Sequence, residues 1–357
     1  MAINESLAHL SDTLFTSAIA TYSVGMVCYA AEYAFGRRGR VASTSVAVER
    51  AKVLAGVGAG SSSRESGVPA APKAMSVVVP PADSVTASGV RQGSAGDLLG
   101  RLGVAVTILG ALIHLGSLVA RGTAADRVPW GNMYEFASVV GLVAVVAFVV
   151  ALIKAPQIRY LGLFAMMPVI LVMFLAGTVW YAQDGPLVPA LKSYWLAIHV
   201  ALVASSEGVL MISAVITGLF LLRQRYDHKI EAMATTGVEK SIRFPVSLGA
   251  RMPAPQTLDR VAYRIVAFAF PLYTCGVIAG AIWAEAAWGR AWGWDPKETW
   301  AFIAWVIYAC YLHARATAGW KGSRAAWINL LGFGAMTFNY LVVNVVISGL
   351  HSYAGLN

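Results

Sequence analysis

VVGLVAVVAFVVAL, at residues 139–152, contains only valine, glycine, leucine, alanine and phenylalanine. A helix in a soluble core would show polar residues at helical spacing, and this stretch shows none. Apolar runs of roughly 20 residues, long enough to cross about 30 Å of hydrocarbon as a helix, recur along the chain. Eight such runs are found, at about 13–35, 100–120, 132–153, 160–181, 194–222, 261–284, 299–317 and 325–349. The pattern predicts an all-α, polytopic integral membrane protein with about eight transmembrane helices.

The composition of the chain supports the same fold class. Of its 357 residues, 58% are hydrophobic and 13% are charged, whereas about a quarter of the residues of a soluble domain are charged. The three cysteines lie inside apolar runs and form no Cys-x-x-Cys pair. Neither a disulfide framework nor thiol redox chemistry is therefore expected.

Basic residues determine the expected orientation in the membrane. The formal net charge is +9, and all but five of the 27 Lys and Arg residues lie in, or at the edge of, segments 36–99, 154–159, 223–264 and 315–324. Cytoplasmic loops carry an excess of Lys and Arg, so we expect these segments to face the cytoplasm at a plasma (inner) membrane. Both the N-terminus and the C-terminus are then extracytoplasmic. The net charge reflects this topology, and no nucleic-acid partner is implied.

Residues 36–98 differ from the rest of the chain. They are rich in Ala, Ser, Gly, Val and Pro and show no sustained periodicity, which predicts a flexible cytoplasmic linker. The linker separates a first transmembrane helix, within 1–35, from a seven-helix domain at 99–357. An external, tryptophan-rich loop at 285–300 belongs to that domain.

Tryptophan is concentrated in this loop. The stretch WGRAWGWDPKETW (288–300) contains four tryptophans, and six of the eleven in the chain fall between 283 and 305. An interfacial belt distributes its aromatic residues over many helix ends. The clustering therefore favours a flat aromatic surface for a ligand, formed by Trp288, Trp292 and Trp294.

The loop ends in a helix-start signature, Asp-Pro-Lys-Glu at 295–298. Asp is a favoured N-cap, Pro is favoured at the first helical position, and Glu three residues after the cap completes a capping box. We expect the next helix to begin at Asp295, and we include this residue with the tryptophans among those that contact the ligand.

Two histidines are expected at the level of the loop. His199 lies about one turn into the outer end of its helix, and His351 follows the outer end of the last helix. Two imidazoles beside an aromatic surface match the axial positions of a haem iron, although each is also compatible with an ordinary hydrogen-bonded interfacial histidine. Arg290 and Lys297 are candidates to pair with the haem propionates, or are solvated loop charges.

Three further ionisable residues lie within expected helices. His313 lies roughly 25 Å deeper than the start of its helix, at 1.5 Å per residue, where an ionisable group is a functional candidate and snorkelling to the interface is the alternative. His114 is either a further haem ligand or a structural hydrogen-bonding residue. Glu207 lies two turns beyond His199, where it either fixes the tautomer of that histidine, relays a proton, or joins two helices.

The stretch WGRAWGWDPKETWAFIAW closely resembles the tryptophan-rich WWD signature of haem-handling membrane proteins. Its Pro-Lys-Glu-Thr-Trp continuation is similar to the CcsA-type (ResC-like, in some lineages labelled CcsB) component of system II cytochrome c biogenesis. Shorter matches follow in family order at VPWGNMYEF (128–136), SYWLAIHV (193–200), YLHAR (311–315) and GLHSYAGLN (349–357). The resemblance covers most of 100–357 and excludes the linker.

The resemblance implies a set of ligands. By position, the two external haem ligands of the family fall on His199 and His351, its transmembrane haem histidine falls on His313, and its haem platform falls on 288–300. His114 matches no role known in the family. The implied cargo is haem b.

The resemblance also implies partners and an activity. The acceptor would be an apocytochrome c with a reduced CXXCH motif, which a thiol-reducing pathway supplies indirectly, and the membrane partner would be a Ccs1/ResB-type protein. We expect the chain to be the haem-handling subunit of a holocytochrome c synthase (haem lyase). This subunit would move haem across the membrane and present it for covalent thioether attachment.

Two other functions fit a polytopic membrane protein. A b-type haem electron-transfer protein usually pairs histidines between helices inside the membrane, and the tryptophan loop would then have no purpose. A haem-free solute transporter would be colourless when purified.

Overall fold

The computed structural model describes residues 4–35, 95–183, 185, 191–237, 241–347 and 349–350. Eight long helices are present in this part of the chain: α1 (Glu5–Phe35), α3 (Ala95–Ala125), α4 (Met133–Lys154), α5 (Gly162–Thr178), α6 (Tyr194–Thr236), α7 (Pro255–Trp288), α8 (Pro296–Ala316) and α9 (Ser323–Phe338). Short helical turns are η1 (Pro156–Leu161), η3 (Val246–Arg251), η4 (Asn339–Val343) and α10 (Asn344–Val346). The described residues form no strand. The predicted all-α class is confirmed.

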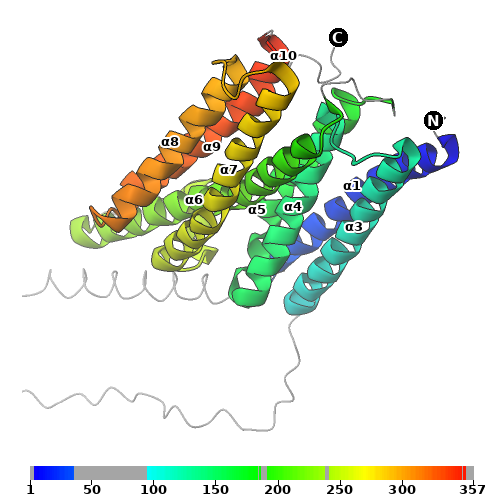
Figure 1. The fold of residues 1–357 in the computed structure, drawn as a ribbon. Coiled ribbons are helices and arrows are strands. Elements are labelled where there is room, and N and C mark those ends of the chain that lie inside the picture. Colours follow the sequence, from blue (N-terminus) through cyan, green and yellow to red (C-terminus); the bar gives the residue numbers. More distant parts are fainter. Residues whose placement is uncertain are drawn as a thin grey trace, which may run out of the picture.

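Seven helices of the described chain are long and apolar enough to cross a membrane. They are α1, α3, α4, α6 and α7, together with the helical segments Ile158–Thr178 and Ser323–Val343. The one remaining expected run, 299–317, corresponds to α8, which has 21 residues and lies alongside α9 (Figure 1). Its tryptophan, tyrosine, histidine and arginine side chains make α8 less apolar than the other seven. The chain is a multi-pass membrane protein.

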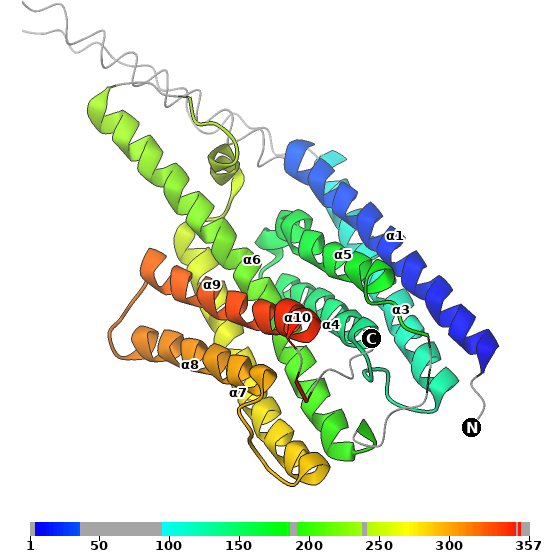
Figure 2. The same cartoon turned by 90° about the horizontal axis from the view of Figure 1, so that it is seen from above.

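The helices form two groups (Figure 2). In the first, which we call the N-terminal bundle, α1 packs along α3 and α5, and α4 packs against α3 and α5. In the second, the C-terminal bundle, α6 packs along α7 and also against α9, while α8 packs against α9 and α7. The two groups meet where α6 packs on α4. The long helix α6 therefore joins the two bundles.

Close approach of α1 and α3 depends on glycine. A Cβ atom at Gly110 would lie 2.8 Å from the ring of Tyr22, and one at Gly103 would lie 3.1 Å from the ring of Tyr29. Both tyrosines are completely buried. Small residues at a membrane helix interface let two helices pack closely in this way, and here the tyrosine rings occupy the space that the glycines leave.

Some boundaries differ from the sequence prediction. Helix α3 begins at Ala95, ahead of the expected domain boundary at 99, and most of the expected linker (36–98) lies outside the described residues. Helix α6 continues to Thr236, so part of the segment expected to be a cytoplasmic loop is helical. The start of α1 and α10 lie at the same end of the molecule (Figure 1). Which side of the membrane they face stays a prediction from the basic residues.

Candidate functional site

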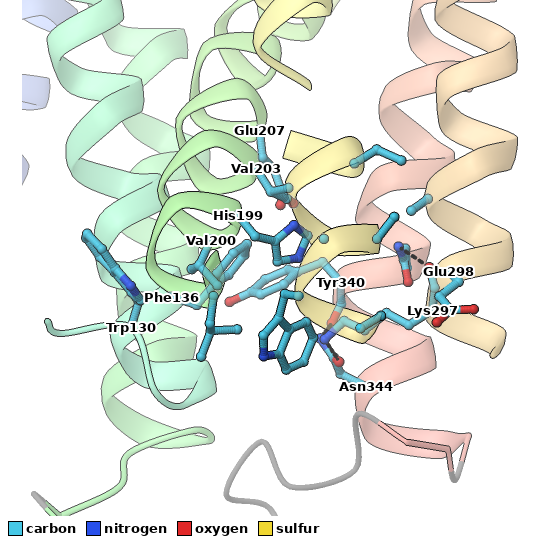
Figure 3. A pocket seen from close by; sticks show the side chains of 18 of the residues that line it. Trp130, Phe136, His199, Val200, Val203, Glu207, Lys297, Glu298, Tyr340 and Asn344 are labelled. Atoms are coloured by element: carbon cyan, nitrogen blue, oxygen red, sulfur yellow. Dashed lines mark hydrogen bonds between the residues drawn. The ribbon is translucent and has the colours of Figure 1, made fainter. Parts of the chain in front are cut away.

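A pocket opens between α4, α6, α7, α8 and the continuous segment formed by α9, η4 and α10 (Figure 3). It contains about 1240 Å³ of space not filled by protein atoms, its open mouth included. Aromatic and polar side chains from distant parts of the sequence line it: Trp130, Asn132, Phe136, His199, Glu207, Tyr273, Trp283, Trp288, Trp292, Lys297, Glu298, Asn339, Tyr340 and Asn344. A largely apolar cavity with a few polar groups is typical of a binding site for a small molecule or cofactor.

His199, on the first turns of α6, is oriented by α7. Its Nδ1 atom lies 2.8 Å from the carbonyl oxygen of Gly276. Because a carbonyl only accepts, Nδ1 carries the proton, and the lone pair of the neutral ring is on Nε2. Metal-binding histidines are usually held by such a hydrogen bond from the other ring nitrogen. His199 thus has the tautomer that a haem ligand needs.

The ring of His199 is also fixed by packing. It lies nearly parallel to the indole of Trp283, with ring centroids 6.1 Å apart and an interplanar angle of 13°. On α7, a Cβ atom at Gly280 would lie 2.7 Å from the imidazole. The absence of a side chain at Gly280 makes room for the ring.

The three tryptophans predicted to form a ligand surface occupy two different environments. Trp288 and Trp292 line the pocket. Trp294 has a backbone φ of 55° and is 68% exposed, and its ring packs edge-on against Trp292 outside the lining. Trp283 and Trp130, which were not predicted as site residues, complete the aromatic wall. Both lie in stretches that the sequence had marked, the tryptophan cluster and VPWGNMYEF.

The loop between α7 and α8 is held by the capping box that the sequence predicts. Glu298 accepts hydrogen bonds through Oε2 from the backbone N–H groups of Gly293 (2.8 Å) and Asp295 (3.2 Å). Asp295 in turn accepts from the backbone N–H of Lys297 at 3.2 Å, and α8 begins at Pro296. These bonds fix the loop backbone relative to the start of α8.

Asp295 has a second partner at the end of the described chain. Its Oδ1 atom accepts a hydrogen bond of 2.8 Å from the backbone N–H of Leu350. The carboxylate is buried, with 7% of the residue exposed. The predicted ligand His351 follows Leu350 in the sequence and lies outside the described residues.

The two basic residues of the loop occupy different environments. Lys297 lines the pocket, and its ammonium group donates a hydrogen bond to the side-chain oxygen of Asn344 (Figure 3). Glu207, which is buried on α6, lines the same pocket. Arg290 is exposed, packs its guanidinium group over Gly293, and is not among the residues that line the pocket. Lys297 is therefore the better placed of the two to meet an anionic group in the pocket.

The turn η4 is a π-helix between α9 and α10. Asn339 and Tyr340 belong to it, and Asn344 follows it directly; all three line the pocket. Insertions of this kind occur frequently at functional sites, because the extra residue rotates the side chains that follow. This turn was not predicted from the sequence.

His114 lies in the N-terminal bundle, away from the pocket, and is completely buried. Its Nδ1 atom is 3.3 Å from the hydroxyl of Tyr22, and its Nε2 atom is 2.8 Å from the hydroxyl of Ser138. Of the two interpretations from the sequence, this geometry supports the structural one. His313 is exposed near the C-terminal end of α8 and is not part of the pocket lining.

A buried carboxylate positions the loop that carries Trp130. Glu135 is completely buried and accepts hydrogen bonds from Arg121 (3.2 Å), from both terminal nitrogens of Arg127 (2.7 and 2.8 Å) and from the backbone N–H of Gly131 (2.7 Å). Both arginines therefore form ion pairs with Glu135 inside the protein. The last of these bonds fixes the residue after Trp130 at the edge of the pocket.

Comparison with known proteins gives consistent matches. Residues 130–351 match the family model described as cytochrome C assembly protein. A "cytochrome c biogenesis protein CcsA" of Guillardia theta is 38% identical over 264 residues, which are 72% of this chain and 86% of that protein. Proteins with the same name from Gloeobacter violaceus (35% over 300 residues, 73% and 88%) and Porphyra purpurea (34% over 282 residues, 72% and 88%) are similar. The matched region contains every residue described above as lining the pocket.

Proposed function

The chain belongs to the cytochrome c assembly protein family and is a haem-handling membrane subunit of cytochrome c biogenesis; we propose that its pocket presents haem b to apocytochrome c in a system II synthase. The observation that carries the proposal is the half-buried His199 in an aromatic pocket, with Nδ1 bound to Gly276 and the lone pair on Nε2. The open face of the pocket would lie on the extracytoplasmic side of the plasma membrane.

The chemistry of the lining fits haem. Trp283, Trp288 and Trp292 provide aromatic faces for a flat macrocycle, and His199 provides one axial ligand. Lys297 provides a cation for a propionate, since a charge-assisted hydrogen bond to a carboxylate is among the stronger polar contacts. Arg290, at the exposed surface, would have at most a secondary role.

His351 is the proposed second axial ligand. Its support is the hydrogen bond between Asp295 and Leu350, which attaches the preceding residue to the loop that lines the pocket. Ligation from two sides would leave the edges of the macrocycle, which carry the vinyl groups, for the substrate protein. His313, exposed on α8, is the proposed transmembrane haem ligand, reached by a histidine of a Ccs1/ResB-type partner.

The proposed reaction is the addition of two thiols to two vinyl groups. Each reduced cysteine of CXXCH forms an S–C bond to a vinyl carbon, while its proton is delivered to the other carbon of that vinyl group, so no oxidant is consumed. The histidine of the motif then takes an axial position on the iron. The pocket would contribute mainly by positioning, which makes the addition effectively unimolecular, and histidine ligation would influence the redox state of the iron.

The test is a spectrum of the purified full-length protein. We expect the absorption of six-coordinate, low-spin haem b, and its identity is checked by the pyridine haemochrome. His199→Gly should lose most of the bound haem and regain it when imidazole is present during purification. His228→Ala is the matched control, because this histidine is exposed on the distal end of α6; it should leave the haem content unchanged. A colourless wild-type protein would overturn the proposal and favour a haem-free transporter.

A further inference from the structure

Glu207 is a buried carboxylate to which the proposed function assigns no role. It lies on α6, two turns beyond His199, and lines the same pocket with 6% of the residue exposed (Figure 3). No described residue donates a hydrogen bond to this carboxylate or forms an ion pair with it. Glu32 and Glu135, the buried glutamates of the N-terminal bundle, are both paired with arginine. A buried charge without a partner is costly, and an ionisable group inside a membrane protein is a functional candidate.

The geometry argues against two of the three roles that the sequence allows for Glu207. The tautomer of His199 is fixed by the carbonyl oxygen of Gly276, 2.8 Å from Nδ1, and not by a carboxylate. Within the described part of the chain, Glu207 forms no hydrogen bond that joins α6 to a neighbouring helix. The role that is left is one inside the pocket, as a charge and as a site for a proton.

The groups around Glu207 do not neutralise it by direct contact. Lys297, at the start of α8, is the charged residue of the described helices that acts on it, but the ammonium group of Lys297 donates its hydrogen bond to Asn344. Tyrosines approach the carboxylate from α7, α8 and η4, and none of their hydroxyl groups donates to it: Tyr273, Tyr308 and Tyr340. The pocket therefore holds an acid and a base at separate places, and His199 lies between them in the view of Figure 3.

We propose that Glu207 tunes the reduction potential of haem in the pocket: its negative charge favours ferric over ferrous iron, and it takes up a proton when the iron is reduced. The proposal rests on the proposed function, which places the iron on Nε2 of His199. Ferric iron carries one positive charge more than ferrous iron, so a nearby carboxylate stabilises the ferric form, and reduction in turn favours the carboxylic acid. A diffusible one-electron reductant supplies the electron and water supplies the proton.

The separation of His199 and Glu207 determines the size of the effect. Eight positions along one helix correspond to about 12 Å, at 1.5 Å per residue. At an effective dielectric constant of about 20, two unit charges at this separation change an equilibrium constant about ten-fold, which for one electron is about 59 mV. Lys297 carries the opposite charge and should shift the potential in the opposite direction. A purely structural role of the two residues would not give shifts of opposite sign.

The experiment is a spectroelectrochemical titration of haem in the purified full-length protein, between weakly acidic and weakly alkaline pH. The midpoint potential of the wild type should fall as the pH rises, because the ionised carboxylate favours ferric iron. Glu207→Gln should remove this dependence and raise the potential at alkaline pH by about 59 mV, whereas Lys297→Met should lower it. Glu285→Gln is the matched control: it makes the same change at an exposed carboxylate on α7, where solvent and salt screen the charge, and it should titrate like the wild type.

The propionates of haem also carry protons, and their contribution is separated by a second ligand. Haem dimethyl ester has no free propionate. A pH dependence that persists in the wild type with the ester, and is absent from Glu207→Gln with the same ester, belongs to Glu207. A pH dependence that disappears in the wild type with the ester belongs to the propionates and overturns the proposal.

Failure of this proposal is distinguishable from failure of the proposed function. A wild-type protein without haem, or a His199→Gly variant with unchanged haem content and spectrum, would overturn both. If haem is bound through His199 but Glu207→Gln keeps the pH dependence of the wild type, the proposed function stands and the role of Glu207 is overturned. Should Glu207→Gln accumulate poorly, the pH dependence of the wild type with haem dimethyl ester decides.

Discussion

His114 and His199 both lie on membrane-spanning helices, one in each bundle, and their surroundings differ in kind. His114 has a hydroxyl within 3.3 Å of each ring nitrogen and no exposed surface. His199 has Nδ1 held by a backbone carbonyl while its ring lines a pocket. Burial alone would favour His114 over His199 as the candidate ligand. What distinguishes the two is that the ring of His199 lines a pocket, whereas the ring of His114 lies in the packed core.

The contrast extends to the charged residues of the two bundles. In the N-terminal bundle, Glu135 is compensated by two arginines, and Glu32 pairs with Arg159. In the C-terminal bundle, Arg315 pairs with Asp259, but Glu207 and Lys297 line the pocket. The ion pairs neutralise charge within the protein, whereas Glu207 and Lys297 place an acidic and a basic side chain beside a space that a ligand can enter. Four predictions test this difference, beginning with the largest expected effect.

Glu135→Ala should destabilise the protein most. It leaves Arg121 and Arg127 without the carboxylate between them, and removal of one partner from a buried ion pair costs about 3–5 kcal/mol. The measurement is the thermal unfolding midpoint in detergent. Glu231→Ala, at an exposed site on α6 (77% exposed side chain), is the control and should unfold like the wild type. An unchanged midpoint for Glu135→Ala would contradict the structural role of the N-terminal bundle.

Gly280→Ala should weaken haem binding by roughly ten-fold without loss of stability. The new methyl group would lie 2.7 Å from the imidazole of His199 and rotate it, whereas Gly→Ala within a helix is itself favourable by up to about 1 kcal/mol. Haem content and a haem titration measure the effect. Gly218→Ala on α6, where a Cβ meets nothing within 4 Å, should bind haem normally; equal affinities of the two variants would argue against the fixed ring.

His114→Leu should give the opposite result, a loss of stability of about 1–2 kcal/mol with normal haem content. It removes the partners of two buried hydroxyls, on Tyr22 and Ser138, and hydrogen bonds between membrane helices contribute about that much or less. Unfolding midpoint and pyridine haemochrome are measured on the same preparation. A large loss of haem at an unchanged midpoint would make His114 a ligand after all.

Lys297→Ala should lower the haem affinity about three- to ten-fold more than Arg290→Ala does. This is the smallest of the four expected effects. Lys297 points into the pocket and Arg290 is exposed, where an ion pair contributes only about 0–1 kcal/mol. Haem titrations at two salt concentrations provide the comparison. A larger effect of Arg290→Ala would mean that the propionates point outward rather than towards α8.

Local patterns in the sequence predict much of this architecture. The apolar runs locate the helices because each is long enough to cross a bilayer, and the Asp-Pro-Lys-Glu pattern predicts the start of α8 because capping involves residues close in sequence. The tryptophan cluster correctly indicates one wall of the pocket. These features depend on interactions within a few residues.

Features that depend on contacts between residues distant in the sequence could not be predicted from the sequence. Trp130 reaches the pocket because Glu135 fixes its loop, and Asp295 binds a backbone group 55 positions away. No feature of the amino-acid composition at 339–343 indicates the π-helical turn found there. The sequence did not distinguish Arg290 from Lys297 as partners of a propionate, because both are basic residues of one loop. The direction in which α8 begins places Lys297 in the pocket lining and leaves Arg290 outside it.

The length of α6 has a mechanical consequence. With 43 residues and no proline it is a rod of about 65 Å, at 1.5 Å per residue, roughly twice the thickness of the hydrocarbon layer. His199 is near one tip, and the other tip extends well past the bilayer. Because no proline interrupts α6, one continuous helix connects the imidazole at the pocket with a tip far from it.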